Sequence, residues 1–112
     1  MMSLFGEEHT LLSDAIEVFH QVCGDLPFTL KFVEEVDAAS NPSIYGMCNF
    51  SKSPPEISIR KGLAEVELID TVIHELAHLA CGQEAGHNEL WERCRDDIHV
   101  RLAALRFEAL GG

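Results

Sequence analysis

Positive charge is scarce in this 112-residue sequence. It has 8 Lys and Arg against 19 Asp and Glu, which gives a formal net charge of −11 at pH 7. Such a surface repels the phosphate backbone of nucleic acids unless the few cations gather on one face. The composition therefore argues against nucleic acid as a partner.

Long apolar runs are also missing. No stretch approaches the ~20 apolar residues that a membrane-spanning helix needs. The first residues, Met1 to Glu8, lack the basic segment of a secretory signal. We therefore expect no membrane partner and a cytoplasmic location, while the oligomeric state stays open.

Closely spaced cysteines are absent: the four cysteines are widely scattered, and no two of them form a Cys-x-x-Cys pair. This spacing argues against a zinc ribbon and against a thioredoxin-type redox motif. We expect the thiols to be reduced and partly buried. They are Cys23, Cys48, Cys81 and Cys94.

The rest of the composition is ordinary for a globular protein, with 46% hydrophobic and 24% charged residues. Length and composition predict one domain over residues 1–112. Apolar residues at helical spacing predict a helix over 5–23, a second from Ala64 to a stop at Gly82, and a third from Asn88 to Gly111. Alternating residues predict strands over 28–32, 44–50 and 56–60.

The connections between the three strands are short, which favours an antiparallel meander over a parallel sheet. The expected fold is therefore α+β, with helices packed on one side of a small, mostly antiparallel three-stranded sheet.

The motif His-Glu-x-x-His lies inside the second expected helix. His74 and His78 are four residues apart, so their imidazoles project from the same side of the helix and can share one ion. Glu75 is offset from both, so its carboxylate can act on a water molecule without binding the metal. Two neutral imidazoles and one acid at this spacing are typical of a hydrolytic zinc site.

A catalytic zinc ion usually has three protein ligands, so a third is expected downstream. His87 is the best candidate, because Gly82 and Gly86 let the chain reverse after the metal helix. A carboxylate would also serve, and the rival candidates are Glu84, Glu89 and Glu92.

Two further residues lie near the motif in sequence. Asp70, one turn before His74, is placed to accept a hydrogen bond from a ligand imidazole, although acids near helix starts also compensate the helix dipole. Cys81 could approach the site, but a small buried thiol is the simpler interpretation.

These motifs together resemble the SprT-like family of zinc metallopeptidases, within the minimal-zincin and gluzincin group. The resemblance covers roughly residues 28–95, and the WLM and YgjP-like groups share the layout. It rests on four segments: Tyr45-Gly46-Met47-Cys48, Ile57-Ser58-Ile59, the helix from Ile69 to His78, and Gly86-His87-Asn88-Glu89-Leu90-Trp91.

The resemblance implies a zinc metalloendopeptidase. It implies Zn²⁺ bound by His74, His78 and His87, and peptide-bond hydrolysis by a zinc-activated water with Glu75 as general base. By analogy, residues 44–50 would form an edge strand that pairs with an extended protein or peptide substrate.

Other interpretations stay open. One is a catalytically silent zincin-like binding module with structural zinc; another is a YbeY-like metal-dependent ribonuclease, which the acidic surface and Glu75 count against. The DNA-binding elements of relatives that act on protein–DNA crosslinks are missing.

A second group to stabilise the oxyanion is not identified, and the candidates are Tyr45, Arg95 and His99.

Overall fold

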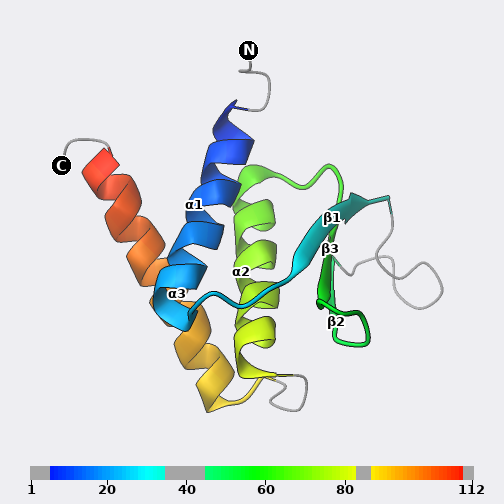
Figure 1. Cartoon of the computed structure of the whole chain (residues 1–112). Helices are drawn as coiled ribbons and strands as arrows, with labels where there is room; N and C mark the ends of the chain where they lie inside the picture. The colour runs from blue at the N-terminus through cyan, green and yellow to red at the C-terminus, as the bar shows by residue number, and fades with distance from the viewer. Residues whose placement is uncertain (1–5, 35–44, 83–86, 110–112) are drawn as a thin grey trace.

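The computed structural model describes residues 6–34, 45–82 and 87–109, and it confirms the α+β class (Figure 1). All six expected elements form, with boundaries within a few residues of those predicted. They are α1 (Gly6–Cys23), β1 (Thr29–Val33), β2 (Gly46–Asn49), β3 (Glu56–Arg60), α2 (Glu65–Cys81) and α3 (Glu89–Ala109). The outer ends of the predictions, at residues 5, 44, 110 and 111, lie outside the described residues.

The sheet is mixed, and the expected antiparallel meander is wrong. The strand order is β1-β3-β2, with β2 antiparallel to β3 and β1 parallel to β3. Among the described strands, only β2 and β3 form a hairpin, joined by a short turn. The connection between β1 and β3 covers residues 34–55 and contains β2. It is therefore long enough for β3 to run parallel to β1.

One face of the sheet is turned toward the helices. Ile57 and Ile59 of β3 are fully buried on this face, and the register places Leu30 of β1 and Cys48 of β2 beside Ile57. Alternate residues of β3 are less buried, as period-two patterning predicts.

The α2 helix lies between the sheet and the other two helices (Figure 1). Apolar side chains on more than one side of it are therefore buried. The buried apolar residues of α2 are Leu68, Val72, Ile73, Leu76, Ala77 and Leu79. No described helix has the length and apolar character needed to cross a bilayer.

Both ends of α2 are formed by local contacts. At the start, the backbone N–H of Ala64 donates to the Glu67 carboxylate at 3.2 Å. At the end, Gly82 adopts a positive φ of 92° and its N–H donates to the carbonyl of His78 at 2.9 Å. The predicted stop at Gly82 is confirmed, because glycine enters this backbone region without steric cost.

The edge strand β2 approaches α2 closely at Gly46. A Cβ atom there would lie 2.6 Å from Thr71 Cγ2 and 3.2 Å from Glu75 Cγ. Real Cβ contacts are longer than 2.6 Å, and the β-branched Thr71 side chain is stiff. The absence of a side chain at Gly46 therefore sets the separation between β2 and α2.

We expect Gly46→Ala to lower the free energy of unfolding by about 1–3 kcal/mol, because the added methyl overpacks this contact. Thr71→Ser removes the methyl that it would meet, so the double variant should regain most of that loss. Urea unfolding of the wild type, both single variants and the double variant measures the coupling. Equal destabilisation with and without Thr71→Ser would contradict this account of the contact.

Candidate metal centre

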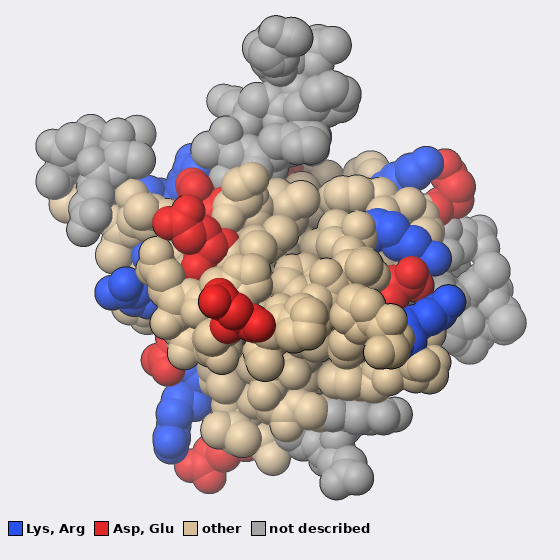
Figure 2. All heavy atoms as spheres, in the orientation of Figure 1, with Lys and Arg blue, Asp and Glu red and all other residues tan. Residues whose placement is uncertain are grey.

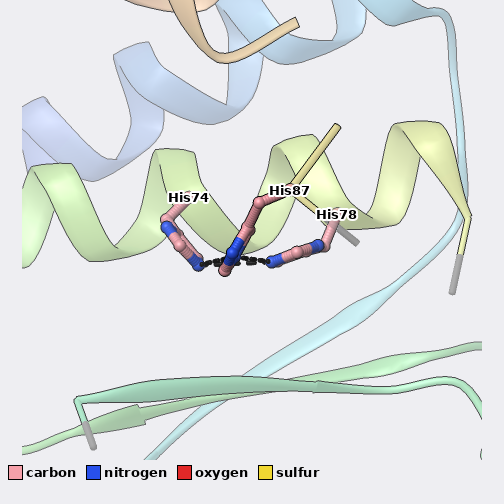
Figure 3. Close-up of side chains that lie close together, drawn as sticks. All are labelled: His74, His78 and His87. Carbon is pink, nitrogen blue, oxygen red and sulfur yellow. Dashed lines mark hydrogen bonds between the residues drawn. The ribbon is translucent and has the colours of Figure 1, made fainter. Parts of the chain in front are cut away.

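Three histidine side chains converge on one point. The Nε2 atoms of His74 and His78 are 3.2 Å apart, those of His78 and His87 are 3.0 Å apart, and those of His87 and His74 are 3.2 Å apart. Figure 3 shows the rings with these nitrogens turned toward one another. Among the described residues, this is the one group of His, Cys, Asp or Glu whose ligand atoms lie close enough to hold a metal ion.

Hydrogen bonding alone does not explain this arrangement. In a neutral imidazole, each Nε2 is either a donor or an acceptor. With three nitrogens in mutual contact, at least one pair must be of the same kind, and such a pair does not form a hydrogen bond. A cation, in contrast, accepts a lone pair from all three nitrogens at once.

The spacing of the three nitrogens fits a tetrahedral ion. Metal–nitrogen bonds of about 2.0–2.1 Å at tetrahedral angles place ligand nitrogens roughly 3.3 Å apart. The observed separations of 3.0 to 3.2 Å are within a few tenths of an ångström of this value. The three histidines therefore fit a small ion such as zinc, and they leave a fourth coordination position without a histidine.

Helix geometry and a capped turn bring the histidines together. His74 and His78 lie one turn apart on α2, so both imidazoles leave the same side of the helix. His87 is held at the start of α3, where the Asn88 side chain accepts a hydrogen bond from the Trp91 backbone N–H at 3.0 Å. Asn88 is a favoured residue for such a cap, and it determines where α3 begins.

Trp91 supports the histidines, a role that the sequence reasoning missed. Its ring centroid lies 4.8 Å from that of His74, 5.4 Å from His78 and 4.6 Å from His87. Its indole N–H donates to the His74 carbonyl at 3.2 Å, and its side chain is buried. The sequence contained a signal for this role: the only tryptophan of the chain lies four residues, or about one helical turn, after the third histidine, His87.

The environment of α2 keeps its imidazoles neutral. Burial, followed by the neighbouring His78, His87 and Arg95, lowers the pKa of His74 to about 4. Burial and then His87 also lower the pKa of His78. Metal ions bind the neutral imidazole, so both side chains are in the ligating form at pH 7.

Glu75 lies where α2 meets the edge strand. With 6% of its surface exposed, it is the one charged side chain that is buried among the described residues. Burial raises its pKa to about 7. Its charge adds to the effect of burial on Cys48 of β2, and together they raise the pKa of that thiol to about 11. Glu75 is therefore a buried acid beside both the first histidine and β2.

The carboxylates proposed as rival third ligands are not part of the histidine group. Glu89 and Glu92 are exposed in the first turn of α3, where acids favour the helix dipole. Glu84 lies outside the described residues. Of the candidates that the structure describes, His87 alone joins His74 and His78.

The remaining candidate residues have other neighbours. Asp70 is exposed, and its carboxylate lies 3.8 Å from His99 of α3. Arg95 pairs with Asp96 at 3.0 Å and lies over the Trp91 ring at 4.9 Å. The Arg60 guanidinium lies over the Tyr45 ring, 6.0 Å from the ring centroid. The structure thus gives Asp70 a partner on another helix. It places Arg95 over Trp91, whose ring lies against the three histidines.

No protein-family model, no curated protein and no solved structure matches this chain. The likeness to SprT-like peptidases therefore rests on the sequence motifs alone.

We expect the wild-type chain to bind one metal ion, with zinc as the first to test, and His87→Ala to lose most of it. Two ligands on one helix do not complete a site that needs three. Elemental mass spectrometry after purification without chelators measures the metal per chain. Glu89→Ala and Glu92→Ala serve as matched controls that keep the metal. Full metal content in His87→Ala would assign the third ligand to another residue.

We expect Trp91→Phe to weaken zinc binding by on the order of tenfold, because phenylalanine cannot donate to the His74 carbonyl. Competition with a chromophoric chelator measures the dissociation constant. Leu90→Ala changes the neighbouring exposed side chain and should leave affinity unchanged. Equal affinities in Trp91→Phe and the wild type would remove Trp91 from the support of the site.

Proposed function

We propose that this protein is a zinc-dependent peptidase that hydrolyses peptide bonds within extended protein or peptide substrates. The observation that carries the proposal is the position of Glu75, a buried acid that follows the first histidine of the group and lies against the edge strand. A histidine site that only stabilised the fold would not need this acid.

His74, His78 and His87 would hold the zinc ion. When bound, zinc supplies Lewis acidity toward a water molecule and toward the substrate carbonyl. The protein supplies the proton transfer. Glu75 takes a proton from the attacking water at a carboxylate oxygen and then delivers it to the leaving amine. Burial of the carboxylate limits competition from bulk water for this proton.

The β2 strand offers a place for the substrate backbone. It pairs with β3 on one side, and no described strand pairs with its other side. The Arg60 N–H donates to the Tyr45 carbonyl at 2.8 Å, which makes these residues a hydrogen-bonded pair. By the alternation of antiparallel pairing, the backbone groups of Gly46 and Cys48 point to the free side.

An extended peptide added along β2 would pass next to Glu75, because Gly46 lies against that side chain. Pairing of this kind uses backbone groups on both sides of the scissile bond and needs no chain terminus. We therefore propose endopeptidase activity rather than removal of terminal residues.

The distribution of charge favours a peptide over RNA. The net charge is −11, and in Figure 2 the basic side chains on the visible face are scattered among acidic ones. A ribonuclease needs cations near the phosphate backbone. The described part of this face has no broad basic patch.

We expect Glu75→Gln to lower peptide cleavage at least 100-fold while zinc content stays at the wild-type level, because the amide binds no proton but keeps the shape of the side chain. Cleavage of internally quenched peptides and elemental mass spectrometry measure the two quantities. Glu65→Gln, an exposed position at the start of α2, is the matched control and should cleave normally.

Unchanged cleavage in Glu75→Gln would overturn the assignment of Glu75. A different result would be zinc binding with no cleavage of any peptide by the wild type, together with a large fall in melting temperature on chelation. That result would instead support the binding module with structural zinc.

A further inference from the structure

Three thiols from three different helices meet at the pair of helices α2 and α3, which pack against each other and which we call the metal-binding hairpin. Cys81 is the last residue of α2, Cys23 is the last residue of α1, and Cys94 lies in α3. The Sγ atoms of Cys81 and Cys94 are 3.3 Å apart, with the Cys81 thiol donating to Cys94. Cys23 also hydrogen-bonds Cys94. The sulfur of Cys94 thus has two thiol neighbours.

We propose that Cys81 and Cys94 are a redox modification site, at which a peroxide converts the two thiols into an intrachain disulfide. A disulfide has an S–S bond of about 2.05 Å, so the two sulfurs need to approach by little more than 1 Å from their 3.3 Å separation. Both side chains are free and half-buried, which leaves a small oxidant access to them.

Peroxide oxidises the two thiols in two steps. Cys94, which accepts the Cys81 hydrogen bond, attacks one peroxide oxygen as the thiolate; an S–O bond forms, the O–O bond breaks, and the departing hydroxide takes the thiol proton to become water. The Cys81 sulfur then attacks the Cys94 sulfur. The S–S bond forms, the S–O bond breaks, and the second hydroxide leaves as water with the Cys81 proton. The two sulfurs are oxidised and the peroxide is reduced.

The hydrogen bond between the thiols supports this order of events. The Cys81 thiol donates to the Cys94 sulfur at 3.3 Å, so Cys81 is already directed at the atom that it attacks in the second step. Burial, together with the hydrogen bond to Cys94, raises the pKa of Cys81 to about 12. Cys81 therefore remains the thiol that donates, and it reacts second.

The disulfide would close the hairpin that carries the third histidine. Cys81 and Cys94 are 13 residues apart, and His87 and Trp91 lie between them. Metal release requires this hairpin to open so that His87 leaves His74 and His78. A covalent bond at the base of the hairpin restricts that opening, and cross-links over loops of this length limit the open state substantially. Oxidation would therefore slow metal release.

The first test maps the bond in the full chain after treatment with hydrogen peroxide. Free thiols are blocked, the chain is cleaved at Arg93, which separates the two cysteines, and the peptides are identified by mass spectrometry. We expect a peptide with Cys81 linked to one with Cys94, and loss of this link on reduction. Cys48→Ser, on β2, is the matched control that should still form it.

Four outcomes would contradict the proposed disulfide between Cys81 and Cys94. They are free thiols throughout, a bond mainly between Cys23 and Cys94, bonds between chains, or oxidation of Cys94 to a sulfinic acid with no link. Cys81→Ser and Cys94→Ser should each abolish the product. Both thiols are half-buried, so circular dichroism is used to verify that each serine variant is folded.

The second test measures zinc release into an excess of a chromophoric chelator, before and after oxidation. We expect release to be about tenfold slower from the oxidised wild type, with no change in Cys81→Ser. Equal rates in both forms would show that the disulfide does not restrain the hairpin. Neither test uses peptide cleavage, so failure of the peptidase proposal leaves both results interpretable.

Discussion

The α2 helix is packed on two sides, since α1 and α3 lie against one side and strands β2 and β3 lie against another. Apolar side chains such as Val72, Ile73 and Leu76 are completely buried as a result. Full burial of such side chains contributes roughly 1.5–3 kcal/mol each. This packing holds α2 in one rotational setting, and the direction of every other side chain on the helix follows from it.

The site depends on that setting. With the apolar side chains of α2 in the core, His74 and His78 are left half-buried on a side that His87, just before α3, can reach. Glu75 is carried to the contact with β2, which comes close only because Gly46 has no side chain. A buried acid, three converging imidazoles and a strand edge that no described strand covers are thereby brought to one region of the molecule.

The hairpin between α2 and α3 determines the third ligand. Gly82 ends the first helix, Asn88 caps the second, and Trp91 connects them through its bond to the His74 carbonyl. The same hairpin brings Cys81 next to Cys94. Metal binding and thiol chemistry are therefore two properties of one short segment, which is why a covalent change at its base would alter the behaviour of the site.

The sequence by itself determined the six elements, the pair His74 and His78 on one side of a helix, and the preference for His87 over the nearby glutamates. These follow from local rules, namely periodicity, helix stops and the chemistry of metal ligands. Only the tertiary structure decided the parallel pairing of β1 with β3, the support from Trp91, the partner of Asp70 and the meeting of three thiols. Each of these joins residues that are distant in sequence, and their contact depends on how complete elements pack rather than on any local preference.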